Sequence, residues 1–157
     1  MCFILHMASK SPAPIVPWND AVKGVWTEPA KEEDIANLRS KFSFEHLTYV
    51  GSSNHCGCGF RHATFQRGDW PQEWHDEDRG YDGADELADH AALVVFLKRN
   101  FAADGMVELL GFWEGGLDQQ IEHRSTISPA RLNDPRFHFR DRGLYTVELV
   151  SEEVPVS

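Results

Sequence analysis

The chain has 157 residues, of which 41% are hydrophobic and 25% are charged, and its formal net charge is -10. A chain of this length can bury one sizeable core, so we expect a single domain that folds alone. Its ordinary composition argues against wholesale disorder. The acidic excess would repel a phosphate backbone, and no apolar segment reaches membrane length, so we expect neither a nucleic-acid nor a membrane partner.

The first strand is predicted at the start of the chain. CFILHMA, residues 2–8, is a continuous apolar run, which is typical of a strand buried on both faces at the centre of a sheet. This start is too short for a signal peptide and lacks a basic leader region. Without export, and with an odd number of cysteines, we expect free thiols or metal ligands in a reducing cytoplasm rather than disulfides.

A short helix and a second strand follow. KEEDIANLRSKF, residues 31–42, places acids in the first turn, basic residues near the end and apolar residues at helical spacing. HLTYVG, residues 46–51, carries β-branched and aromatic residues in alternation, which predicts a strand. The cysteine-containing segment after it therefore lies at a strand end, where sites are often built.

The second half of the chain predicts the main helix and two more strands. Residues 84–102 are apolar nearly all round in the stretch AALVVFL, which indicates the longest helix and the main core helix. We expect His90 on this helix to be a satisfied, half-buried histidine. Residues 106–113 and 144–150 alternate apolar residues with glutamates, as strands do. Residues 125–137, between these strands, have room for one helical turn.

These elements predict an α+β fold. We expect a single domain in which two main helices cover one face of a mixed or mostly antiparallel sheet of about four strands. A doubly wound sheet is the alternative, which we disfavour because the last two strands lack a crossover of helix length.

The segment GSSNHCGCGFRH, residues 51–62, contains Cys56 and Cys58. In an extended strand their Cα atoms would lie about 6.6 Å apart, too far to share one ion comfortably. Gly57 and Gly59 permit positive φ angles, so the loop can curl until the two sulfurs approach the roughly 3.7 Å that a tetrahedral zinc ion requires.

A zinc site needs further ligands. Cys2 is the third thiol, and it meets the loop if the first strand pairs beside the end of the second. His62 is the most suitable fourth ligand, because a short turn after Cys58 could bring its ring back. His6 lies about 13 Å along the strand from Cys2, and His55 would tend to point away. The predicted metal ligands are Cys2, Cys56, Cys58 and His62.

Three interpretations of the cysteines stay open. The first is an inert arrangement, in which Cys2 is a small buried hydrophobe and CGCGF is a tight glycine turn. The second is the metal site. The third is a reactive thiol, and hence a cysteine-dependent enzyme. In one version, loss of Met1 would leave Cys2 as an N-terminal nucleophile, as in class II amidotransferase-like hydrolases, although the chain is short for that fold.

The tryptophans suggest a different class of function. Trp70, Trp74 and Trp113 stand beside carboxylates, so a ligand pocket that uses Glu114, or a tryptophan-rich surface for a protein partner, is the alternative. Tryptophans that pack against core edges are the plainer explanation. We expect the neighbouring acidic loop to be solvated rather than cation-binding. Its residues are Glu73, His75, Asp76, Glu77 and Asp78.

The start MC, the proline loop ending in PW and the stretch YVGSSNHCGCGF together resemble a family of small uncharacterised bacterial proteins. The resemblance is best over residues 1–60 and weaker at LLGFWEGG and LYTVEL. It implies no activity, substrate or cofactor. It does imply that Cys2, Cys56 and Cys58 stand where such sequences carry cysteine, whereas the acidic stretch 69–83 is particular to this chain.

Overall fold

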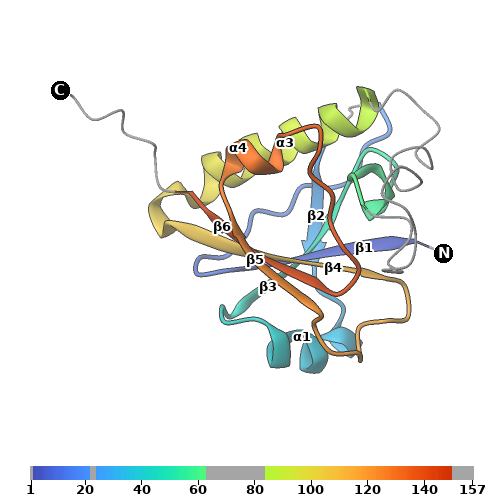
Figure 1. Ribbon diagram of the computed structural model, residues 1–157, viewed down its shortest axis with the longest axis vertical. Helices are drawn as coiled ribbons and strands as arrows, with labels where there is room; N and C mark the ends of the chain where they lie inside the picture. Colours follow the sequence, from blue (N-terminus) through green and yellow to red (C-terminus); the bar gives the residue numbers. More distant parts are fainter. Residues whose placement is uncertain (1, 22–23, 63–83, 150–157) are drawn as a thin grey trace.

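The computed structural model describes residues 2–21, 24–62 and 84–149, which form one six-stranded sheet with helices on both faces (Figure 1). The strands are β1 (Phe3–Ser9), β2 (Trp26–Pro29), β3 (His46–Gly51), β4 (Met106–Trp113), β5 (His123–Ile127) and β6 (Gly143–Glu148). The helices are α1 (Ile35–Lys41), α3 (Ala84–Phe101) and α4 (Pro129–Leu132). Short 3-10 turns are η1 (Glu32–Asp34), η2 (Gly57–Gly59) and η3 (Ala102–Asp104).

The strand order is β2-β3-β1-β4-β6-β5. All neighbouring strands are antiparallel except β5 and β6, which are parallel. β1 lies inside the sheet, between β3 and β4, as its continuous apolar sequence predicts. The register sets Leu5 opposite Val50, so the start of β1 lies beside the end of β3.

Helices α3 and α4 cover one face of the sheet (Figure 1). Phe3, Leu5 and Met7 of β1 share a core cluster with Leu93 and Leu97 of α3, and all five side chains are fully buried. This core takes up the apolar side of α3, which explains why that helix is so hydrophobic. Within the described part of the chain, no helix is both long and apolar enough to cross a membrane.

Helix α1 covers the opposite face, where His6 of β1 is buried. Its ring stacks on Phe112 at 5.5 Å between ring centroids and meets Tyr49 edge-on at 5.6 Å. Its Nδ1 atom is buried with no hydrogen-bond partner, and burial lowers the pKa of His6 to about 4. The smaller core on this face consists of Ala8, Leu38, Phe42, Leu110, Phe112, Leu117 and Leu144.

The predicted α+β class is confirmed, and two features of the prediction are wrong. The sheet has six strands instead of about four, because β2 and β5 were not expected. The helices lie on both faces instead of one, because the even-numbered residues of β1 are covered as well as the odd-numbered ones. β3 and β4 have the predicted bounds, and the single helical turn expected in residues 125–137 is α4.

Candidate metal centre

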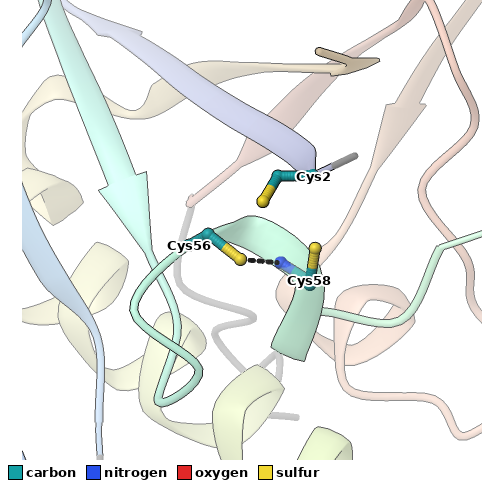
Figure 2. A group of neighbouring side chains, drawn as sticks. All are labelled: Cys2, Cys56 and Cys58. Carbon is teal, nitrogen blue, oxygen red and sulfur yellow. Dashed lines mark hydrogen bonds between the residues drawn. The ribbon is translucent and has the colours of Figure 1, made fainter.

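The three cysteines meet at the start of β1 (Figure 2). Cys2 immediately precedes β1, Cys56 is the N-cap of η2, and Cys58 lies within η2. Their Sγ atoms all lie within 4.8 Å of one another, and they are the only group of three or more potential ligand residues found among the described residues. All three thiols are free and half-buried. Two segments that are far apart in the sequence thus supply one sulfur cluster.

Strand pairing explains why the segments meet. Because β1 and β3 are antiparallel, the loop after β3 begins beside the start of β1. The loop then folds back so closely that a Cβ atom at Gly57 would lie 2.5 Å from the carbonyl oxygen of Phe3. The backbone N–H of Phe3 donates to Cys58 Sγ at 3.2 Å, which joins the strand directly to the cluster.

The residue of the loop with left-handed backbone is His55, not a glycine. The φ angle of His55 is 66°, whereas neither Gly57 nor Gly59 has a positive φ. The prediction that these glycines supply left-handed backbone is therefore wrong. They supply space, since a Cβ atom at Gly59 would lie 2.6 Å from the Asp89 carboxylate. Glycine at these two positions lets η2 lie against β1 on one side and α3 on the other.

Ser52 holds the loop in this shape. Its backbone N–H and its hydroxyl both donate to the carbonyl of Cys56, at 2.7 and 2.5 Å. The same hydroxyl accepts from the backbone N–H of Gly59 at 2.9 Å, and the Ser52 carbonyl accepts from the Trp26 indole at 3.0 Å. Ser52 is fully buried, so these bonds are shielded from water and fix the backbone on both sides of the Cys56 sulfur.

Helix α3 supports the loop through a buried aspartate. The Asp89 carboxylate accepts from the backbone N–H of Ser53 at 3.2 Å and from its hydroxyl at 2.8 Å. Hydrogen bonds to a buried charged group are stronger than those between neutral groups. Asp89 therefore anchors the loop that carries Cys56 to the main helix.

The next residue of α3, His90, holds the end of the loop. Its Nε2 accepts from the backbone N–H of Arg61 at 2.7 Å, so the proton lies on Nδ1, which donates to the Leu132 carbonyl at 2.8 Å. Burial lowers the pKa of His90 to about 4, which keeps the ring neutral near pH 7. Both ring nitrogens are bonded, as predicted, although the side chain is fully rather than half buried.

The thiols lie in a negative environment. The contact with the Cys56 thiol raises the pKa of Cys2, and the nearby Glu114 carboxylate raises it further. Burial raises the pKa of Cys56. Three thiolates this close would repel one another. The Glu114 carboxylate lies 3.3 Å from the Cys2 nitrogen and adds to the negative potential. A bound cation would reverse this effect, because it stabilises the thiolate form of every sulfur that it contacts.

A row of aromatic rings borders the cluster on the side of β2 and β3. Trp18 stacks on His55 at 3.9 Å, and the row continues through Trp26 to Tyr49, with centroid separations of 5.4 and 5.2 Å. Burial, and then the charge that Cys56 would carry, raise the pKa of Tyr49. The phenol of Tyr49 is therefore neutral near pH 7.

His62, the predicted fourth ligand, lies near the cluster but outside it. Its Nδ1 atom is 2.7 Å from the Phe60 carbonyl oxygen. Its ring stacks on Phe3 at 4.7 Å and meets Trp113 edge-on at 5.1 Å. It does not belong to the group of ligand atoms within 4.8 Å. The structure thus brings three of the four predicted ligands together, and ligation by His62 stays a prediction.

Of the other candidate residues, the structure describes Trp113 and Glu114. Trp70, Trp74 and the acidic residues 73–78 fall outside the described residues. Trp113 is half-buried against the main core, in keeping with the plainer explanation for the tryptophans. Glu114 is exposed and pairs with Cys2 across the strands, with its backbone N–H donating to the Cys2 carbonyl at 2.9 Å.

Two supports of the site were missed from the sequence. Ser52 directly follows β3, where a serine is ordinary in a turn. Asp89 and His90 form a polar pair directly before the apolar stretch AALVVFL of α3, and that pair was the available signal for Asp89. A charged residue on the buried side of a core helix needs a partner, and here the partner is the cysteine loop.

No family model, no curated protein and no solved structure matches this chain. The geometry of the three cysteines and the chemistry of sulfur therefore carry the functional argument. The resemblance to a bacterial family, drawn from the start of the chain and the GSSNHCGCGF stretch, stays a prediction.

Proposed function

We propose that the protein binds a zinc ion through Cys2, Cys56 and Cys58, and that the ion ties the loop after β3 to the start of β1. The observation that carries this proposal is the convergence of three sulfurs from two separate segments within 4.8 Å. Zinc bound at about 2.3 Å to each sulfur needs sulfur separations of roughly 3.7 Å, which are about 1 Å shorter. We expect rotation of the cysteine side chains to supply that change.

The chemistry of the ligands supports a thiophilic ion. Thiolates favour zinc and other soft or borderline ions, whereas magnesium and calcium prefer oxygen. The backbone N–H of Phe3 donates to Cys58 Sγ, and that of Cys58 donates to Cys56 Sγ at 3.3 Å. Such outer contacts orient sulfur ligands and stabilise their charged form. Inert thiols packed as small hydrophobes would need neither these donors nor one another.

Three sulfurs leave one tetrahedral position, for which we propose His62. The Nδ1 atom of His62 lies within hydrogen-bond distance of a backbone carbonyl. A histidine that binds zinc through Nε2 usually donates its other ring N–H to such a carbonyl or to a carboxylate. Ligation requires the ring to move from its stack on Phe3 towards the sulfurs.

The test begins with the full chain purified without a histidine tag or chelator. We expect one zinc ion per chain by elemental analysis, and sulfur-to-cobalt charge-transfer absorption when cobalt replaces zinc. Cys2→Ser and Cys56→Ser should each lower zinc affinity by more than about 100-fold, since loss of an outer contact alone costs about 10- to 100-fold. His62→Ala should cost less than either cysteine variant and shift the cobalt spectrum. His46→Ala, opposite Ser9 at the far end of β1, is the matched control and should keep full affinity.

Circular dichroism of each variant separates loss of the ligand from loss of the fold. A folded, metal-free protein with three ordinary thiols that does not take up zinc would overturn the proposal. So would unchanged zinc affinity in the folded Cys2→Ser variant. An unchanged cobalt spectrum in His62→Ala would remove His62 from the ligand set and leave the three sulfurs in it.

A further inference from the structure

We infer that the same three thiols form a site of two-electron oxidation, at which hydrogen peroxide joins Cys2 to Cys56 in a disulfide. The bond would link the start of β1 covalently to the loop after β3. The disulfide itself does not depend on a metal. Its effect on a bound ion rests on the proposed function.

The thiols are already close enough to react with one another. Their Sγ atoms lie within 4.8 Å, all three are half-buried, and Figure 2 shows the sulfur of Cys2 directed towards the two loop cysteines. A disulfide needs sulfurs about 2.05 Å apart and Cα atoms usually within about 6.8 Å. The Phe3–Cys58 hydrogen bond and the packing of Gly57 on Phe3 already hold the two segments together. Formation of the bond therefore needs no new association of segments.

The surroundings favour the pair Cys2–Cys56 over a bond within the loop. Cys58 Sγ accepts the backbone N–H of Phe3, and a Cys2–Cys56 bond leaves this contact in place. A Cys56–Cys58 bond would draw that sulfur away and reshape η2. The turn has little room to change, because Gly57 and Gly59 are packed against Phe3 and Asp89 with no space for a Cβ atom.

The chemistry is complete with peroxide as the oxidant. One cysteine sulfur attacks a peroxide oxygen and breaks the O–O bond, which gives a sulfenic acid and, after proton transfer, one water. The second cysteine sulfur attacks the sulfenic sulfur, forms the S–S bond and releases the second water. Overall, two thiols and one hydrogen peroxide give one disulfide and two waters, so sulfur loses the two electrons that peroxide gains.

Oxidation would remove two of the three sulfur ligands from a bound ion. One trithiolate-bound zinc, one peroxide and two protons give a disulfide, one thiolate, a free zinc ion and two waters. Cys58 and the proposed ligand His62 would then be the only ligands left, fewer than the three protein ligands that even open zinc sites keep. The inference thus adds to the proposed function that binding of the ion is controlled by the redox state of its ligands.

The experiment treats the zinc-loaded full chain with hydrogen peroxide and follows three quantities together. They are zinc released to a chromogenic chelator, free thiols per chain, and disulfides identified by tandem mass spectrometry of the unreduced digest. We expect one zinc released, thiols falling from three to one, and a Cys2–Cys56 link that dithiothreitol reverses. Cys58→Ser should form the same link, and Cys56→Ser should not form it. Circular dichroism of the reduced variants checks that each is folded.

A Cys56–Cys58 bond, an intermolecular bond or sulfinic acid as the main product would overturn the inference. The two proposals fail separately. Zinc binding without the Cys2–Cys56 link would leave the metal centre standing and end the redox inference. Formation of the Cys2–Cys56 link in a protein that never binds zinc would support the redox inference and end the proposal of a metal centre.

Discussion

The two ends of β1 are joined to neighbouring segments by different chemistry. At the far end, the Ser11 hydroxyl and backbone N–H donate to the Asp104 carboxylate at 2.8 and 3.2 Å. At the near end, the Phe3 N–H donates to the sulfur of Cys58 at 3.2 Å, beside two more thiols. Oxygen atoms make strong hydrogen bonds within the protein, whereas thiols are weak donors and acceptors.

The two ends differ in how far their polar groups satisfy one another. The Asp104 end brings together donors and an acceptor that satisfy one another, so it needs no added group. The cysteine end brings together three groups of the same kind, which would repel one another when ionised and which a cation would join. Ser52, Asp89 and His90 hold these groups in place through hydrogen bonds to the loop that carries Cys56 and Cys58.

Acid should have the greatest effect, through two buried histidines of which one, His90, supports the cysteine end and the other, His6, lies on the face that α1 covers; both are measured in metal-free protein. Burial lowers the pKa of His6 and His90 from 6.5 to about 4. Above pH 6.5 both states are neutral. Between pH 6.5 and 4 only the unfolded chain takes up the protons, so the free energy of unfolding should fall by about 3 kcal/mol for each histidine. Urea unfolding at a series of pH values measures this loss.

His6→Phe is the matched variant for that measurement. It removes one of the two buried histidines, together with the Nδ1 atom that has no partner, and should flatten the pH dependence by about half. His90→Phe should instead destabilise the protein at pH 7, because it strands the Arg61 N–H and the Leu132 carbonyl. An unchanged slope in the folded His6→Phe variant would contradict the assignment.

A second prediction compares the two aspartates directly. Asp89→Ala should lower the free energy of unfolding by about 3 kcal/mol, since buried hydrogen bonds to a charged group are worth roughly 1.5–3 kcal/mol each. Asp104→Ala, at the more exposed end, should cost about 1 kcal/mol. Zinc affinity should fall only in Asp89→Ala. Equal loss of affinity in both variants would show that the two ends are not independent.

Withdrawal of zinc should have a third, local effect. At free zinc of about 100 times the dissociation constant, bound metal stabilises the folded state by about 2.7 kcal/mol, which a chelator removes. Hydrogen exchange should quicken at the Phe3 and Cys58 amides, which donate to sulfur, and stay constant at the Ser11 amide, which donates to Asp104. Uniform quickening at all three amides would argue against a local metal centre.

The smallest effect is expected from crowding the loop. Gly57→Ala would place a methyl group 2.5 Å from the Phe3 carbonyl oxygen and should destabilise the protein by about 1 kcal/mol or more. Gly24→Ala, which has no atom within 4 Å of its new methyl group, is the control and should be neutral or slightly stabilising. Calorimetric unfolding of both variants checks this. Identical melting temperatures would mean that the loop does not need to lie so close to β1.

The elements that were predicted correctly carry a strong pattern of their own. The continuous apolar run of β1, the alternation in β3 and β4, and the all-round hydrophobicity of α3 each specify one structure. β2 and β5 carry no such pattern. β2 has four residues and ends in Pro29, and β5 has the sequence HRSTI, so both depend on a neighbouring strand. A short stretch of sequence does not show which neighbouring strand such a segment will pair with.

The site was predictable in part, because β1 and β3, which bring its segments together, have strong sequence patterns. Antiparallel pairing of two well-marked strands brings Cys2 to the loop, and that step follows from the sequence. The turn at His55 and the support from Ser52 and Asp89 depend on how closely η2 approaches β1 and α3. Distances of that kind are set by packing between distant segments, which spacing along the chain does not encode.

The outermost strands of the sheet also bear on self-association. β2 and β5 are its shortest strands, and among the described residues the outer side of β2 meets only the single bridge from Val16 to Thr27, while no strand pairs with the outer side of β5. At β2 the Thr27 N–H already donates to the Val16 carbonyl at 2.9 Å and Pro29 offers no N–H, whereas β5 presents an exposed arginine, Arg124. Short edges that carry proline or charge resist edge-to-edge pairing. We therefore expect β2 and β5, the two strands that the sequence did not predict, to keep the longer interior strands from pairing with a second molecule.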